Sequence, residues 1–138
     1  MNFRKLKKND FKQYIDLMNE FRPTIKCSKS KFEELYDNIF KNNIIFIIEK
    51  NNEIIATGKL LVEQKFFHNF AKYGHIEDII VKETYRGNKI GLYLVQNILE
   101  YCKKNYFFKI TLTCNKELIH FYEKNNFEVY NIHMSQLL

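Results

Sequence analysis

The segment from Arg86 to Gly91 reads Arg-Gly-Asn-Lys-Ile-Gly and has the residue types of a phosphate-binding turn. It follows a predicted strand that ends at Val81 and opens a predicted helix. The first N–H groups of a helix lack partners within it and carry partial positive charge, so a pyrophosphate can accept several of their hydrogen bonds. Glycine permits close backbone approach, and Arg86 and Lys89 add charge. The residues alone leave two interpretations open: a pyrophosphate cradle, or an ordinary strand-to-helix turn with basic residues.

Two adjacent carboxylates, Glu77 and Asp78, interrupt the apolar run 73–81 that precedes this turn. Neighbouring side chains point to opposite faces of a regular strand, so one carboxylate would face the core. Burying a carboxylate without a partner is costly. The pair therefore indicates a β-bulge or a polar site, and a salt bridge at a strand edge is the structural alternative.

The elements that position these residues follow from apolar periodicity. A helix should begin at Asn9 or Asp10 and a second one at Ser28 or Ser30, because these residues can cap a helix. Asn51 and Asn52 tolerate positive φ and should form the turn of a hairpin. The pattern predicts strands at 3–7, 44–49, 53–62, 73–81, 107–114 and 127–137, and a short helix at 117–124. It also predicts a long helix after the loop, with an apolar stripe at Leu94, Val95, Ile98, Leu99 and Cys102.

Composition limits the classes of function. The 138 residues fit one domain, 1–138, and the net charge is +6. Basic residues are spread among acidic ones, which favours a solvated basic surface over nucleic-acid binding, and the same positive field would attract a polyanionic small molecule. Three widely spaced cysteines indicate neither a disulfide framework nor a zinc site. The polar first residues and the lack of an apolar run of about 20 residues predict a cytoplasmic protein without a membrane span.

The loop is similar to the R/Q-x-x-G-x-G/A coenzyme A motif of the GNAT acetyltransferases. Arg86 and Gly91 fill its first and last positions, and Lys89 stands where many members have Gly. The chain further resembles the eukaryotic glucosamine-6-phosphate N-acetyltransferases over residues 57–127. The resemblance rests on EQKFFH at 63–68, Ala71-Lys72, GHIEDIIV at 74–81, YFFKITL at 106–112 and FYEKNNF at 121–127.

This resemblance implies an α/β GNAT fold, with a mixed, mostly antiparallel twisted sheet of about six to seven strands and about four helices. It implies direct transfer of the acetyl group of acetyl-CoA to the 2-amino group of D-glucosamine 6-phosphate, without a metal. The product, N-acetyl-D-glucosamine 6-phosphate, lies on the route to UDP-N-acetylglucosamine. The related enzymes are homodimers, so a dimer through the C-terminal strand is expected.

The resemblance also implies catalytic roles. Glu77 and Asp78 would contact the substrate amine and hydroxyls, with Glu77 as the proton acceptor, directly or through a water. Tyr122 would donate a hydrogen bond or a proton to the departing thiolate; the residues alone favour a core tyrosine there. The main-chain carbonyl of Thr113, where an acidic residue is usual, would approach the amine. Cys114 is expected to be a core residue at a strand end.

Binding roles follow in the same way. The backbone of the last strand residues would pair with the pantetheine arm and polarise the thioester carbonyl. The full set expected to hold acetyl-CoA is Ile79, Ile80, Val81, Arg86, Gly87, Asn88, Lys89, Ile90, Gly91, Leu92 and Tyr122.

Lys65 and His68 are expected to hold the sugar and its phosphate, and His75 is expected to be a hydrogen-bonded strand residue rather than a catalyst. The family often has a basic residue next to its C-terminus that reaches the sugar phosphate of the partner subunit, whereas this sequence ends Gln-Leu-Leu. We expect Arg22 to compensate, because a guanidinium can bind phosphate through two hydrogen bonds.

The sequence leaves two other functions open. One is a GNAT acetyltransferase that acts on another small amine. The other is a non-catalytic domain that binds acetyl-CoA or nucleic acid, which would have no need of Glu77, Asp78 and Tyr122.

Overall fold

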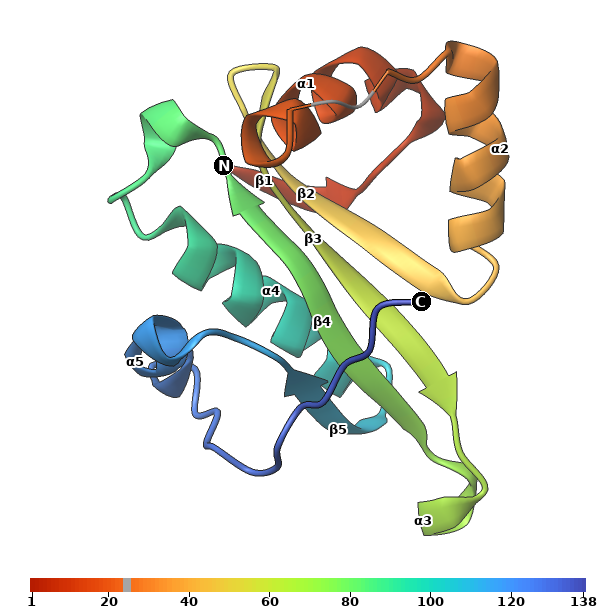
Figure 1. Ribbon diagram of the computed structural model, residues 1–138, viewed down its shortest axis with the longest axis vertical. Helices are drawn as coiled ribbons and strands as arrows, with labels where there is room; N and C mark the ends of the chain where they lie inside the picture. The colour runs from red at the N-terminus through yellow and green to blue at the C-terminus, as the bar shows by residue number, and fades with distance from the viewer. Residues whose placement is uncertain (24–25) are drawn as a thin grey trace.

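A five-stranded sheet forms the centre of the computed structural model, which describes residues 1–23 and 26–138 (Figure 1). The strands lie in sequence order across the sheet. Neighbours from β1 to β4 are antiparallel, whereas β5 runs parallel to β4. Their bounds are β1 Asn2–Lys5, β2 Asn43–Lys50, β3 Glu53–Gln64, β4 Lys72–Val81 and β5 Phe107–Leu112.

Helices cover both faces of this sheet. Helices α1 and α2 pack on one face and α4 packs on the other, each against its own apolar cluster (Figure 1). The helices are α1 Phe11–Phe21, α2 Lys29–Ile39, α4 Ile90–Lys104, the short α5 Ile119–Glu123 and a single turn, α3 Phe67–Phe70. Three 3-10 turns complete the described elements: η1 Lys8–Asp10, η2 Glu83–Tyr85 and η3 Lys116–Leu118.

Local sequence signals account for most of these elements. The side chain of Ser28 caps α2 by accepting a hydrogen bond from the N–H of Lys31 at 3.1 Å. Asn51 and Asn52 adopt φ values of 52° and 61° in the β2–β3 turn, as their tolerance of positive φ predicts. The predicted apolar stripe of α4 is buried against the sheet at Leu94, Val95, Ile98 and Cys102.

A β-bulge interrupts β4 at the two carboxylates. Thr57 of β3 pairs with Ile80 and Lys59 pairs with Glu77, so two residues of β4 lie opposite the single Gly58. Asp78 takes a φ of 54° there. The extra residue reverses which face the alternate side chains occupy. Ile76, before the bulge, packs in the α4 cluster, and Ile80, after it, packs in the α1–α2 cluster.

The prediction of a strand at 127–137 is wrong for the described chain, which has no regular element after residue 123. The described part of the chain therefore has five strands, where about six to seven were expected, and five helices, where about four were expected. The tail has strand composition, but a strand requires a neighbour for its backbone hydrogen bonds. Its apolar side chains are instead exposed: Val129, Tyr130, Ile132, Met134, Leu137 and Leu138.

No helix in the described ranges is long and apolar enough to cross a membrane.

Candidate acetyl-transfer site

The strands β4 and β5 separate halfway along β4. Their parallel pairing runs from Lys72 opposite Phe107 to Ile76 opposite Leu112, and it stops there. The strand β4 continues to Val81, so its second half has no neighbour on the β5 side among the residues that the structure describes. Backbone N–H and C=O groups on such an edge are free to bind another extended group.

A pocket of about 470 Å³ lies beyond this point of separation. Its walls are the end of β4, the turn that leads into α4, and one side of α5. Ten of the eleven residues expected to hold acetyl-CoA line it: Ile79, Ile80, Val81, Arg86, Gly87, Lys89, Ile90, Gly91, Leu92 and Tyr122. The sequence did not identify the other lining residues, which are Phe21, Tyr85, Leu118, Phe121 and Lys124.

The turn before α4 presents backbone donors to this pocket. Lys89 occupies the N-cap of α4 in the left-handed region, with φ 58°, and no side chain caps the helix. The first N–H groups of α4 therefore have no side-chain acceptor and can bind an anion. Lys89 adopts the conformation that Gly would take most easily at this position, and it keeps a positive charge there.

Asn88 shapes the turn and does not line the pocket. Its side-chain amide donates hydrogen bonds to the carbonyl oxygens of Tyr85 and Arg86, at 3.2 and 3.4 Å. The Nε of Arg86 donates to the carbonyl oxygen of Val81 at 3.1 Å and so ties the loop to the end of β4. Gly87 has φ 82°, which favours glycine.

Tyr122 reaches the pocket from α5 and is buried. Burial raises the pKa of its hydroxyl, and the Cys114 thiol and the Glu77 carboxylate raise it further. The phenol is thus protonated at neutral pH and is available as a hydrogen-bond donor. The fold brings Tyr122 within electrostatic range of Glu77, which lies 45 positions earlier in the chain.

The two carboxylates have different surroundings. Oε1 of Glu77 lies 3.0 Å from Nε2 of His75, whereas Asp78 forms an ion pair with the Nζ of Lys59 at 3.2 Å. Asp78 also lies near Tyr14 of α1. The pKa of Tyr14 is raised to about 12, first by the burial of its ring and then by the negative charge of Asp78. The bulge therefore gives each carboxylate a polar partner. These partners offset the desolvation cost of placing two adjacent carboxylates in one strand.

The remaining predicted residues lie apart from one another within the single chain. Arg22 is exposed and stacks its guanidinium over the ring of Phe21, 5.5 Å from the centroid, beside the pocket. Thr113 is exposed just past the end of β5. Lys65 pairs with Glu63 at 2.7 Å near α3.

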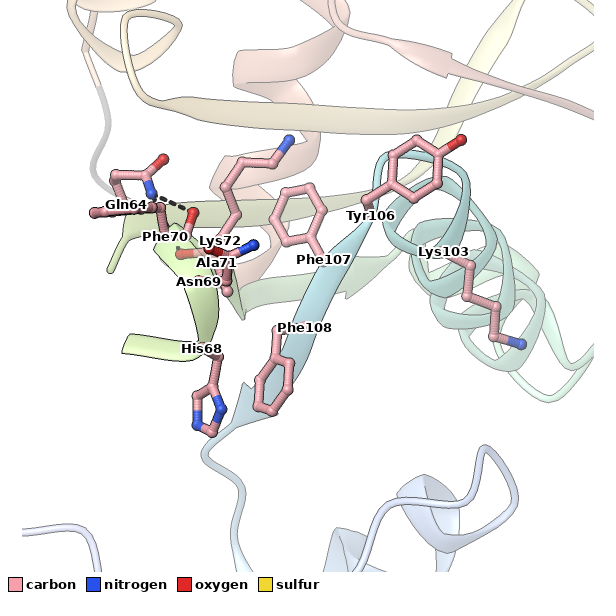
Figure 2. A pocket seen from close by; sticks show the side chains of 10 residues that line it. All are labelled: Gln64, His68, Asn69, Phe70, Ala71, Lys72, Lys103, Tyr106, Phe107 and Phe108. Atoms are coloured by element: carbon pink, nitrogen blue, oxygen red, sulfur yellow. Dashed lines mark hydrogen bonds between the residues drawn. The ribbon is translucent and has the colours of Figure 1, made fainter. Parts of the chain in front are cut away.

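His68 stacks on Phe108, with ring centroids 3.9 Å apart (Figure 2). The two rings border a second hollow of about 700 Å³. This end of the sheet lies opposite the turn into α4 (Figure 1), and the ten-residue strand β4 between them spans about 30 Å. One chain therefore does not bring Lys65 and His68 to the pocket that holds Tyr122.

Sequence reasoning missed three polar partners: Lys59 and Tyr14 beside Asp78, and Thr111 beside His75. The i, i+2 spacing of His75 and Glu77 puts both on one face of β4 and was a signal that could have linked them. The contacts across strands depend on the register of β3 and β5, for which the sequence carries no comparable sign.

The chain is similar in sequence to known acetyltransferases. Residues 11–127 match the acetyltransferase (GNAT) family. Glucosamine 6-phosphate N-acetyltransferase of Candida albicans is 37% identical over 88% of this chain and 85% of its own length. Glucosamine 6-phosphate N-acetyltransferase 1 of Dictyostelium discoideum is 36% identical over 98% of this chain and 89% of its own.

A solved structure of a named relative has the same fold. The crystal structure of glucosamine-6-phosphate N-acetyltransferase from Arabidopsis thaliana superposes with a TM-score of 0.91 at 31% identity, and it covers 99% of this chain and 97% of that one. With the β4–β5 separation, the uncapped α4 and the buried Tyr122 in place, this chain belongs to the acetyltransferase (GNAT) family, among the glucosamine 6-phosphate N-acetyltransferases.

Proposed function

We propose that this protein transfers the acetyl group of acetyl-CoA to the 2-amino group of D-glucosamine 6-phosphate, giving N-acetyl-D-glucosamine 6-phosphate and coenzyme A. The observation that carries the proposal is the pocket where β4 and β5 separate, which is lined by Tyr122 and by the turn into the uncapped α4, with Glu77 within electrostatic range of Tyr122. The relatives named above bear the name of this activity. A proton acceptor and a proton donor are what acyl transfer to an amine requires.

The pocket fits acetyl-CoA in three respects. The uncapped first turn of α4 and the charge of Lys89 suit a pyrophosphate. The unpaired edge of β4 from Ile79 to Val81 suits the amide-containing pantetheine arm. Gly91 leaves room between α4 and α5, since a Cβ there would lie 3.1 Å from Cζ of Phe121. A predicted acetyltransferase from Clostridium acetobutylicum, which has a similar fold at 20% identity and a TM-score of 0.72, was crystallised with acetyl-CoA.

Acetyl-CoA supplies an acetyl group activated as a thioester, whose transfer to an amine releases a thiolate. Glu77 accepts a proton from the substrate ammonium group, because only the neutral amine has a lone pair with which to attack. Tyr122, whose raised pKa keeps it protonated, donates to the departing sulfur. Asp78 binds the sugar hydroxyls, and the carbonyl of Thr113 accepts a hydrogen bond from the amine.

The phosphosugar site requires a second subunit. Lys65 and His68 lie at the far end of the β3–β4 hairpin and hold the sugar and its phosphate at the pocket of the other subunit. Arg22 contacts the phosphate beside the pocket. We expect two chains to pack through the C-terminal segment 127–137, whose apolar side chains are mostly exposed and which would form the predicted strand against the partner. Removing residues 128–138 should change the protein from a dimer to a monomer in sedimentation equilibrium. A full-length chain that sediments as a monomer at all concentrations would contradict this part of the proposal.

The enzyme is expected to work in the cytoplasm, where its three free cysteines remain reduced.

The direct test of the function measures coenzyme A release from acetyl-CoA with glucosamine 6-phosphate, glucosamine and a panel of other small amines. Turnover should be highest with glucosamine 6-phosphate and should be lost in a Glu77→Gln variant. Glu100→Gln serves as the control, because Glu100 is an exposed carboxylate on α4 whose ion-pair partner, Lys103, has no proposed role in the reaction. Equal turnover with unphosphorylated amines would point to another acceptor, and salt-dependent nucleic-acid binding without transfer would point to a binding domain.

A further inference from the structure

Three polar side chains form a continuous chain across β4 and β5. Oγ1 of Thr111 lies 2.7 Å from Nδ1 of His75, and Nε2 of the same ring lies 3.0 Å from Oε1 of Glu77. His75 and Thr111 are direct partners in the β4–β5 register. His75 and Glu77 lie two residues apart on the same face of β4.

This chain lies where the two strands separate. The pair His75–Thr111 is the last but one in the register, and the strands part after Ile76 pairs with Leu112. Glu77 is the first residue of β4 beyond the paired region, and it is close enough to Tyr122 to raise the pKa of that phenol. The three side chains therefore connect the end of the β4–β5 pairing to the proposed reaction site.

The chemistry of the three groups sets the direction of each hydrogen bond. An ionised carboxylate only accepts, so Nε2 of His75 must carry the proton that is donated to Glu77. In the neutral ring Nδ1 is then an acceptor, and the hydroxyl of Thr111 is its donor. Glu77 thus sets the tautomer, and Thr111, whose hydroxyl can donate to Nδ1, holds the plane of the imidazole ring.

One oxygen of Glu77 remains available. Oε1 is bound to His75, whereas Oε2 has no hydrogen-bond partner within residues 1–23 and 26–138. The side chain of Glu77 is 44% exposed, so without the contact to His75 its carboxylate would sample several rotamers. Holding one oxygen fixes the direction of the other.

We propose that His75, with its ring plane held by Thr111, is a positioning residue that holds Glu77 so that Oε2 faces the substrate ammonium group. The inference rests on the proposed function of Glu77. In the step it serves, an N–H bond of the ammonium breaks and an O–H bond forms at Oε2. The products are a neutral amine and a protonated Glu77, while His75 keeps its own proton.

A matched pair of substitutions separates positioning from simple strand packing. The amide nitrogen of Gln can occupy the place of Nε2, so His75→Gln retains a donor to Glu77. Asn is shorter and can reach only the place of Nδ1, so His75→Asn keeps a polar group near Thr111 and leaves Glu77 without its donor. Both replacements are neutral amides, so a loss common to both would reflect packing.

We expect His75→Asn to lower kcat with glucosamine 6-phosphate by on the order of ten- to a hundredfold, as is usual for a misplaced catalytic group. The Kd for acetyl-CoA should not change. His75→Gln should keep kcat within about threefold of the wild type, about 0.7 kcal/mol in barrier height. Urea unfolding should show the same stability for both variants. Equal kcat for the two variants, or a fall in kcat that parallels stability, would overturn the proposal.

A measurement that needs no turnover tests the same geometry. The ¹⁵N shifts of the His75 ring should show the Nε2–H tautomer in the wild type and a mixture of tautomers in Glu77→Ala, which removes the acceptor at Nε2. An Nδ1–H tautomer in the wild type would refute the inference. If the wild type does not acetylate glucosamine 6-phosphate, the proposed function fails, and the ring shifts still decide the role of His75 toward Glu77.

Discussion

A single methyl group added at Gly58 would test how tightly β3 supports the wall of the pocket. Gly58 is the residue opposite the bulge, and a Cβ built there would lie 2.6 Å from Cδ1 of Ile79 and 3.1 Å from Cδ1 of Ile98. Carbon atoms in good contact are about 3.5–4.0 Å apart, so the overlap with Ile79 is roughly 1 Å. The φ of Gly58 is not in the left-handed region, so crowding is the only cost to Ala.

The crowding should be relieved toward the pocket. Ile98 and Leu94 are fully buried and cannot move without disturbing the core, whereas Ile79 lines the pocket. Overpacking of this kind costs about 1–3 kcal/mol of stability. A displaced Ile79 narrows the pocket, and each 1.4 kcal/mol of lost binding energy corresponds to about a tenfold change in Kd. We expect Gly58→Ala to weaken acetyl-CoA binding by roughly three- to tenfold.

Urea unfolding and isothermal titration with acetyl-CoA measure the two effects separately. The matched control is Gly74→Ala, where a Cβ would lie 2.8 Å from Cδ1 of both Ile110 and Leu60, none of which lines this pocket. Gly74→Ala should lose similar stability and keep the wild-type Kd. If Gly58→Ala bound acetyl-CoA as tightly as Gly74→Ala does, the reasoning about Ile79 would be refuted.

Three further predictions concern single side chains. Tyr122→Phe should lower kcat by on the order of a hundredfold or more, without changing the Kd for acetyl-CoA, because only the donor to the thiolate is lost; an unchanged kcat would remove this role. Tyr14 has a folded pKa of about 12 against about 10 when unfolded, so its stabilising effect is complete below pH 10 and is lost as the pH rises through 12. Tyr14→Phe should therefore gain about 1.4 kcal/mol over the wild type between pH 9 and pH 11 in urea unfolding, and an equal difference at both pH values would contradict the assignment. Arg22→Ala should raise KM on the order of tenfold for glucosamine 6-phosphate and leave KM for glucosamine unchanged, and an unaltered KM for the phosphosugar would exclude the phosphate contact.

Local chemistry made much of the fold predictable. Ser28, the Asn51–Asn52 turn and the α4 stripe each act through neighbours a few residues away, and each appears where it was expected. The pair Glu77 and Asp78 indicated a bulge or a site for a similar reason: two adjacent carboxylates do not fit a regular buried strand. The structure has the bulge.

The tail 127–137 shows where such reasoning stops. Its composition is that of a strand, yet a strand forms only when another strand accepts its hydrogen bonds. No described segment of this chain pairs with it, and its apolar side chains are exposed. The sequence pattern of a segment indicates its preference for strand structure. Whether a neighbouring strand is available to pair with it depends on the rest of the fold.

The sequence by itself determined the order of the strands and longer helices up to residue 123, the Gly-containing turn before α4 and the identity of its polar residues, because each depends on spacing along a few consecutive positions. Only the tertiary structure decided that Glu77 lies within electrostatic range of Tyr122, that Thr111 orients His75, and that Lys65 and His68 lie at the opposite end of β4 from the pocket. These relations depend on strand register and on the point where β4 and β5 separate. Both are set by packing between segments that are distant in the chain, and no local pattern encodes them.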